Sequence, residues 1–248
     1  MSLHLLQVRL KKLIFLLRYP RLIKALIQYQ LLATVEHAMI IGDQFATIID
    51  IGANKGQFTL ACRTLSPSSK IISFEPLPNA AIKFDQFFKG DQSVSLFKAA
   101  IGPLKGQELM HISARDDSSS LLPMGKEQVK AFPRTEEVGT INVDVAPLSY
   151  FLKPSDISAP ALLKIDVQGY EFEVLMGCES LLDGFDQVYC ECSFVELYTG
   201  QKLADSVIDW LYQHRFKLTG IYNVAYDDGG KAIQADFLFK RMSSLSVA

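Results

Sequence analysis

Short apolar runs rich in β-branched residues alternate with helix-like segments through most of the chain after residue 44. Residues 46–51 and 70–74 have the pattern of buried strands, and residues 56–65 between them have the pattern of a helix. Buried strands that alternate with helices form a parallel sheet covered on both faces. The alternation therefore predicts an α/β fold with right-handed crossover connections.

The same alternation continues toward the C-terminus. Further strands are expected at 93–99, 106–112, 140–145, 161–167, 187–192, 216–221 and 233–239, and further helices at 79–88, 170–176 and 204–214. The turn sequence Asp227-Asp-Gly-Gly230 is typical of a hairpin, so the last two strands should be antiparallel. Residues 113–139 form a long polar stretch, which we interpret either as a lid or substrate loop or as a surface insertion.

Charge is distributed unevenly along the 248 residues. Residues 1–35 contain six basic and no acidic residues, which leaves 19 basic and 27 acidic residues, a net charge of −8, in the rest of the chain. An acidic body argues against nucleic acid as a partner. With 49% hydrophobic residues, the chain is long enough to bury a core without disulfides.

We expect three parts: a basic amphipathic helical extension (residues 1–40), a main domain (41–241) and a frayed tail (242–248). The extension should be two helical pieces broken at Pro20, and its longest uncharged run, 25–35, is too short to span a bilayer. The extension could dock on an anionic membrane surface, or it could pack as a helical cap on the body or on a second copy in a homodimer.

Four cysteines, at positions 62, 178, 190 and 192, have neither metal-like nor redox-like spacing. Their apolar neighbours predict buried free thiols and a reducing compartment. The expected location is therefore cytoplasmic, at the inner membrane face if the extension docks there. No spacing in the sequence requires a metal ion.

The segment Asp50-Ile-Gly-Ala-Asn-Lys-Gly56 follows the first strand and precedes the first helix. Gly52 and Gly56 allow a sharp turn and a close approach of a ligand, and the helix start favours an anion. Asp50 can accept hydrogen bonds from a cation, so a ligand with an amine and a carboxylate suits this turn. The spacing is not that of the dinucleotide fingerprint, which argues against a nicotinamide-dependent dehydrogenase.

Glu75 ends the second strand, nineteen residues after Gly56. An acidic residue at about this place in a βαβ unit binds the hydroxyls of a ribose. A third group lies past the strand at 161–167: Asp166 and Gln168 occupy the edge where open α/β sheets bind ligands, and Glu171 falls in the first turn of the next helix.

Together these segments resemble the FkbM family of S-adenosylmethionine-dependent methyltransferases over roughly residues 45–241. The resemblance is carried by Ile49-Asp-Ile-Gly-Ala-Asn-Lys-Gly56, Phe74-Glu-Pro76, Ala99-Ala-Ile-Gly102, Ser119-Ser-Leu121, Leu163-Lys-Ile-Asp-Val-Gln-Gly169 with Glu171, and Asp236-Phe-Leu-Phe239. It implies a Rossmann-like seven-stranded sheet with an antiparallel last strand. The family usually has glutamate where this chain has Gln168, and an amide cannot serve as an anionic base or a good metal ligand.

The resemblance also implies S-adenosylmethionine as cofactor and S-adenosylhomocysteine as product. The residues expected to hold the cofactor are Asp50, Gly52, Ala53, Asn54, Gly56, Glu75, Ala100, Ile101, Asp166 and Gln168.

Family members O-methylate hydroxyls of sugars or of natural products, so the expected acceptor is a sugar hydroxyl in a glycan or glycolipid, with a natural-product small molecule as the alternative. Because Gln168 replaces a carboxylate, a non-catalytic cofactor-binding scaffold is a further alternative. An alcohol is a poor nucleophile and needs a base. Asp166 is the first candidate, followed by Glu191 and Glu171, with His111 and His214 as outside choices.

Overall fold

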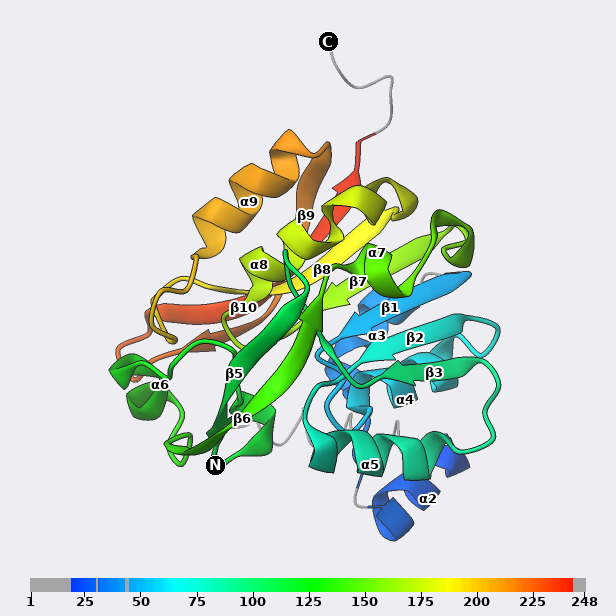
Figure 1. The fold of residues 1–248 in the computed structure, drawn as a ribbon, viewed down its shortest axis with the longest axis horizontal. Coiled ribbons are helices and arrows are strands. Elements are labelled where there is room, and N and C mark those ends of the chain that lie inside the picture. The colour runs from blue at the N-terminus through cyan, green and yellow to red at the C-terminus, as the bar shows by residue number, and fades with distance from the viewer. Residues whose placement is uncertain (1–18, 30, 43–44, 243–248) are drawn as a thin grey trace.

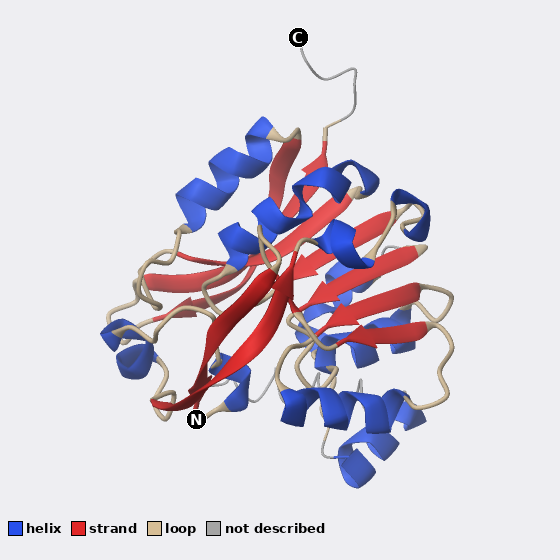
Figure 2. Ribbon diagram, viewed as in Figure 1, coloured by secondary structure: helices blue, strands red, loops and turns tan. Residues whose placement is uncertain are grey.

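The computed structural model describes residues 19–29, 31–42 and 45–242. The first helical piece of the expected extension and the tail from residue 243 therefore lie outside the described residues. The described chain forms two sheets with helices packed around them (Figures 1 and 2).

The larger sheet has seven strands in the order β3-β2-β1-β7-β8-β10-β9. Their bounds are β1 Thr47–Ile51, β2 Lys70–Phe74, β3 Val94–Phe97, β7 Ala161–Ile165, β8 Gln187–Ser193, β9 Phe216–Tyr226 and β10 Ala232–Arg241. The pairs from β3 to β8 are parallel, and β10 runs antiparallel to both β8 and β9. The expected α/β fold, with a Rossmann-like seven-stranded sheet and an antiparallel last strand, is confirmed.

Helices cover both faces of this sheet (Figure 2). One face carries α2 Pro20–Tyr29, α3 Ala38–Ile41, α4 Gln57–Leu65 and α5 Pro78–Phe88, and the other carries α7 Leu148–Phe151, α8 Glu171–Cys178 and α9 Ala204–Gln213. Successive strand residues point to opposite faces of the sheet. Ile48 therefore packs in the core on the side of α2–α5, and Ile49 packs in the core on the side of α7–α9. Burial on both faces explains why these strands are continuous apolar runs.

The strand order reverses beside β1, which pairs with β2 on one side and β7 on the other. In open α/β sheets, ligands bind at such a switch point, outside the carboxyl ends of the strands. The turns after β1, β2 and β7 therefore meet at the place where a binding crevice is expected.

A second sheet of three strands, in the order β4-β6-β5, lies beside this edge (Figure 1). Its strands are β4 Ala100–Ile101, β5 Gly106–Ser113 and β6 Glu137–Ala146. Between β5 and β6, the expected long loop contains the 3-10 helix η2 Asp116–Ser118 and α6 Lys126–Ala131.

The segment between β5 and β6 is anchored on the loop that follows β8. The Gly125 amide donates a hydrogen bond to the Leu197 carbonyl at 2.8 Å, and the Tyr198 hydroxyl lies 3.0 Å from the Ser118 carbonyl. These long-range contacts order a stretch whose own sequence gives no periodic signal.

The described part of the extension packs on the body. Leu22 and Ala25 of α2 are buried in the same core as Phe84, and the Tyr29 ring meets the Phe87 ring edge-on at 5.1 Å. For residues 19–42, packing on the body is thus the arrangement observed. Within the described ranges, every helix is too short or too polar to cross a membrane. All four cysteines are buried free thiols, as expected.

Candidate active site

The turn between β1 and α4 is shaped by backbone that only glycine tolerates. Gly52 has a φ of +81°, and a Cβ on it would lie 1.8 Å from the Asp166 carbonyl oxygen. Gly56 has a φ of +94° and packs against the rings of Phe84 and Phe88. Gly52 therefore brings the turns after β1 and β7 together, whereas Gly56 fits the start of α4 against α5.

Glu75, at the end of β2, is 4% exposed, and its carboxylate faces the β1 turn. Its Oε2 accepts a hydrogen bond from the Asn54 amide at 2.8 Å, and its Oε1 accepts one from the Leu77 amide at 2.7 Å. Burial raises the pKa of Glu75 to about 7, against the lowering effect of these two amides. Each oxygen keeps a lone pair that can accept from a ligand hydroxyl.

Asp50 does not lie where the sequence analysis expected it. Its side chain is fully buried and does not line the cavity that contains Glu75. The cation paired with Asp50 is Lys164 on β7, at 3.1 Å between Nζ and Oδ1. Thr59 donates to its other oxygen at 2.8 Å. Sequence reasoning missed Lys164, although a lysine inside the apolar strand Ala161–Ile165 is an unusual signal.

Lys164 links Asp50 to the cavity. Its ammonium donates to the Gly52 carbonyl at 3.2 Å and lies 3.7 Å from Asp166 Oδ2. Burial alone would lower the pKa of Lys164, but the carboxylates of Asp50 and Asp166 raise it above the usual lysine value. The result is a fixed positive charge beneath the turn that carries Asp166.

The Gln168 side chain forms a hydrogen bond with the Asp166 carboxylate. Its Nε2 donates to Asp166 Oδ1 at 2.9 Å and to Glu191 Oε2 at 3.0 Å, while its Oε1 lies 3.0 Å from the Tyr198 hydroxyl. Gln168 has a φ of +59° and Gly169 a φ of +100°, so the backbone is turned to bring the amide into this position. A glutamate at this position would face two other carboxylates and could not donate to them.

Glu191 and Glu171 lie outside the wall of the cavity. Glu191 accepts from Gln168 and from Gln234, and burial together with Asp166 raises its pKa well above the usual range. Glu171 is 3% exposed, and its Oε1 accepts from the backbone amides of Val167 and Gly169 at 3.1 and 3.0 Å. Burial raises the pKa of Glu171 to about 7. Among the three expected base candidates, the structure brings only Asp166 to the cavity.

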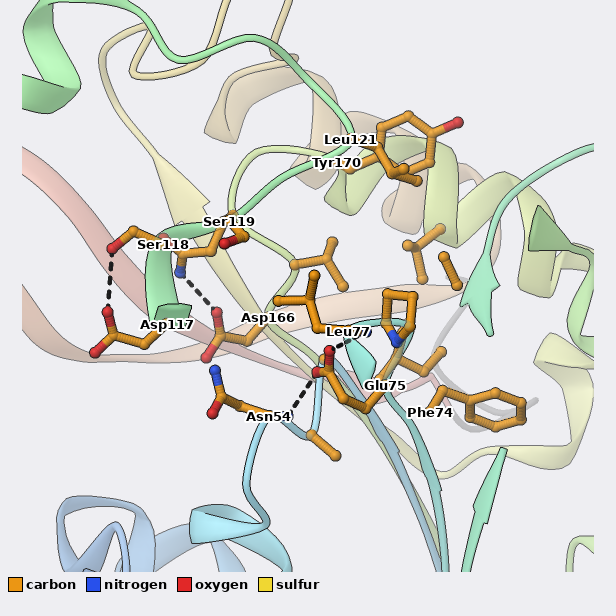
Figure 3. A pocket seen from close by; sticks show the side chains of 18 of the residues that line it. Asn54, Phe74, Glu75, Leu77, Asp117, Ser118, Ser119, Leu121, Asp166 and Tyr170 are labelled. Atoms are coloured by element: carbon orange, nitrogen blue, oxygen red, sulfur yellow. Dashed lines mark hydrogen bonds between the residues drawn. The ribbon is translucent and has the colours of Figure 1, made fainter. Parts of the chain in front are cut away.

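A single cavity of about 330 Å³ connects these turns, a size within the range of small-molecule sites. Figure 3 shows Glu75, Leu77 and Phe74 at one end, Asp117 and Ser118 at the other, and Asp166 between them. Of the expected cofactor residues, those that line the cavity are Gly52, Ala53, Asn54, Glu75, Ala100, Ile101, Asp166 and Gln168.

Another part of the cavity wall comes from the segment between β5 and β6 and from the extension. The segment between β5 and β6 contributes polar and aromatic side chains to this wall: Arg115, Asp117, Ser118, Ser119, Gln128 and Phe132. Thr34 and His37 of the extension also line it, and neither was singled out from the sequence. His111 pairs with Glu137 on β6, His214 caps the end of α9, and neither lines the cavity.

The sheet order and the glycine turn define a Rossmann-like fold with a ligand site at the switch point. A family model described as "Methyltransferase FkbM domain" matches residues 50–218. The chain therefore belongs to the FkbM methyltransferase family and is a methyltransferase, as the resemblance predicted. Membership implies S-adenosylmethionine as the methyl donor.

Two curated proteins are similar in sequence. The 2-O-methyltransferase NoeI of Sinorhizobium fredii is 28% identical over 170 residues, which covers 66% of this chain and 70% of NoeI. Methyltransferase 1 of Beauveria bassiana is 28% identical over 147 residues, covering 53% of this chain and 58% of that protein.

Among solved structures, a methyltransferase FkbM from Methylobacillus flagellatus aligns with a TM-score of 0.49 and 10% identity. The alignment covers 77% of this chain, which spans 43% of that protein.

Proposed function

We propose that the protein is an O-methyltransferase that transfers the methyl group of S-adenosylmethionine to a hydroxyl of a sugar in a glycan or glycolipid. The observation that carries this proposal is the position of Asp166, between a cavity end with a buried carboxylate and an end with polar side chains. NoeI, by its name, methylates an oxygen, which supports the same chemistry here.

The residues at the Glu75 end fit the cofactor. The Glu75 carboxylate matches the two ribose hydroxyls, Gly52 lies in the cavity wall beside it, and Ala100 and Ile101 provide an apolar wall suited to an adenine ring. When bound, S-adenosylmethionine supplies an electrophilic methyl group on a sulfonium. Asp50 acts in this proposal through Lys164 rather than by contact with the cofactor.

Asp166 is the proposed base for the acceptor hydroxyl. Lys164 and Gln168 fix its carboxylate in one orientation, and its side chain remains 37% exposed on the cavity side. Fixing an acceptor oxygen in line for transfer can contribute about 7–11 kcal/mol to catalysis. A positioned base adds roughly 10²- to 10⁴-fold.

A polar wall opposite the cofactor end favours a hydroxyl-rich acceptor over a purely apolar one. Arg115, Ser118 and Gln128 supply donors and acceptors, and Phe132 supplies an aromatic face. A natural-product alcohol is the second acceptor class, and an acceptor screen separates the two. A non-catalytic scaffold would bind cofactor without turnover.

Three parts of the chain are proposed to act differently. Residues 41–241 form the methyltransferase domain, residues 1–40 form an extension whose described part packs on it, and residues 242–248 form a tail. The free thiols support a cytoplasmic location. Loss of liposome binding after deletion of residues 1–35 would support contact of the extension with the membrane.

Calorimetric titration with S-adenosylhomocysteine tests the cofactor site. Micromolar binding is expected for the wild type, with loss in Glu75→Ala and no change in Glu179→Gln, an exposed glutamate far from the cavity. If wild-type protein did not bind, or if Glu75→Ala bound equally well, this assignment of the cavity would be wrong.

A further inference from the structure

A histidine from the N-terminal extension reaches the acceptor side of the cavity. His37 closes the 3-10 helix η1 Val35–His37, and both it and Thr34 line the cavity wall. The Thr34 hydroxyl is buried and has no hydrogen-bond partner among the described residues. Both positions precede the segment that the family model matches, residues 50–218.

The His37 ring is held on two sides by aromatic rings. Phe58 and Tyr189 each contact it edge-on, at 5.5 Å between ring centroids. Phe58 also lies under the Lys164 ammonium at 5.4 Å. Because Lys164 is 3.7 Å from Asp166, a continuous set of contacts connects the histidine to the proposed base.

A buried hydrogen-bond chain fixes the His37 ring nitrogens. Nδ1 lies 2.9 Å from the Tyr189 hydroxyl, and that hydroxyl donates to Asp236 Oδ2 at 3.0 Å. Asn223 also donates to Asp236 Oδ2, at 2.7 Å. Since the Tyr189 hydrogen is given to the carboxylate, its oxygen accepts. Asn223 Nδ2 donates to this oxygen at 3.5 Å, and we infer that His37 Nδ1, at 2.9 Å, is the nearer donor.

This arrangement leaves His37 Nε2 with an unshared lone pair. Tyr189, which Nδ1 contacts, is 2% exposed and does not line the cavity, whereas His37 itself does. We infer that Nε2, on the other side of the ring, is the nitrogen that faces the cavity. None of the described residues forms a hydrogen bond with Nε2. A neutral imidazole oriented in this way accepts a hydrogen bond from a ligand hydroxyl.

Burial keeps the His37 ring neutral. Burial lowers the pKa of His37 and outweighs the effect of Asp236, which raises it. Lys164 lowers the pKa further, while Glu36 and Asp166 raise it. The neutral form is the one that can accept at Nε2.

We propose that His37 Nε2 binds a hydroxyl of the acceptor next to the hydroxyl that is methylated at Asp166, so that the site selects a vicinal diol. Tyr189 and Asp236 are positioning residues that act through His37. This inference rests on the proposed function, and it refines the acceptor class to sugars and other compounds with neighbouring hydroxyls. One hydroxyl hydrogen cannot serve two acceptors, so Asp166 and His37 each require their own hydroxyl.

Nitrogen NMR of the histidine rings in the full chain tests the geometry without any acceptor. With the His37 signals assigned by comparison with His37→Asn, the wild type should show a protonated Nδ1 and an unprotonated Nε2 at pH 7.5. In Tyr189→Phe the two tautomers should become mixed. A protonated Nε2 in the wild type would overturn the proposal.

Kinetics with methyl glycosides as acceptors test whether His37 binds the acceptor. His37→Asn keeps a group at the Nδ1 position and removes Nε2. Its acceptor KM should rise at least tenfold, with kcat and the affinity for S-adenosylhomocysteine within about threefold of wild type. His37→Gln should restore part of the loss, and His214→Asn, a histidine away from the cavity, should change nothing.

The matching substrate change is removal of the neighbouring hydroxyl. A deoxy glycoside should lose about tenfold in kcat/KM with the wild type and almost nothing with His37→Asn. Equal losses in both proteins would contradict a role for His37. If the wild type binds S-adenosylhomocysteine but methylates no glycoside, both the sugar proposal and the vicinal-diol acceptor class are wrong. The tautomer measurement tests the His37 geometry independently of that outcome.

Discussion

The Lys164 ammonium lies 3.1 Å from the Asp50 carboxylate beneath the cavity, and both side chains are almost fully excluded from solvent. The pair joins β7 to β1 at the switch point of the sheet. Breaking a buried ion pair on one side leaves an uncompensated charge and costs about 3–5 kcal/mol. This pair therefore supports the fold at the place where the proposed base is held.

Lys164→Met should lower the free energy of unfolding by about 3–5 kcal/mol, because Asp50 then stays buried without its cation. The double variant Lys164→Met with Asp50→Asn should lose less than the sum of the single losses, since no charge remains unpaired. Urea unfolding of the four proteins measures the coupling. Additive losses would show that the pair does not act as a unit.

Binding of S-adenosylhomocysteine should depend on pH through Glu75. Its carboxyl has a pKa of about 7, and the protonated form loses an acceptor for the ribose hydroxyls. Affinity should therefore fall roughly tenfold between pH 8 and pH 6. Calorimetry at both values tests this in wild type and in Glu75→Gln, whose weaker binding should not vary with pH.

Stability should depend on pH through Glu171. Burial raises its pKa from the usual 4.5 to about 7, so the native state binds more protons than the unfolded state between these values. The contribution of Glu171 to stability is therefore lost as pH rises through this window, by roughly 3 kcal/mol in total. Glu171→Gln keeps an acceptor for the Val167 and Gly169 amides and removes the titration.

The free energy of unfolding of Glu171→Gln, relative to wild type, should accordingly increase from pH 5 to pH 7.5. Methyl transfer by this variant should remain within a few-fold of wild type. A complete loss of turnover in a folded Glu171→Gln protein would assign the catalytic base to Glu171 instead of Asp166.

Gln168→Glu should reduce turnover. The new carboxylate would face Asp166 and Glu191 and would remove the amide that donates to both. Like charges raise the pKa of neighbouring carboxyls, so the acid limb of the pH–rate profile should move to higher pH. Gln168→Met removes the donor without adding charge. It should lower turnover and shift the acid limb of the pH–rate profile less than Gln168→Glu does. Unchanged profiles would show that Gln168 does not position the base.

The sheet could be predicted from the sequence because its strands are short apolar runs between glycine turns. The positions of Gly52 and Glu75 also follow from the sequence, since both directly follow a strand and must lie at its carboxyl end. Local sequence therefore predicts well the end of the cavity where we propose that the cofactor binds.

The acceptor side could not be predicted in this way because its residues are brought together by tertiary contacts. His37 reaches the cavity only through the packing of the extension, and its hydrogen-bond partner Tyr189 is 152 positions away along the chain. The role of Asp50 also depended on a distant residue: Lys164, from another strand, takes the place of the cationic ligand that the sequence suggested.

Methyl transfer to an oxygen with Asp166 as base is tested most directly with S-adenosylmethionine labelled with ¹³C in the methyl group. Wild-type protein with methyl glycosides should yield a labelled methoxy signal, and Asp166→Asn should yield none while binding S-adenosylhomocysteine within a few-fold of wild type. A label found on nitrogen or carbon, or undiminished turnover by Asp166→Asn, would contradict the account.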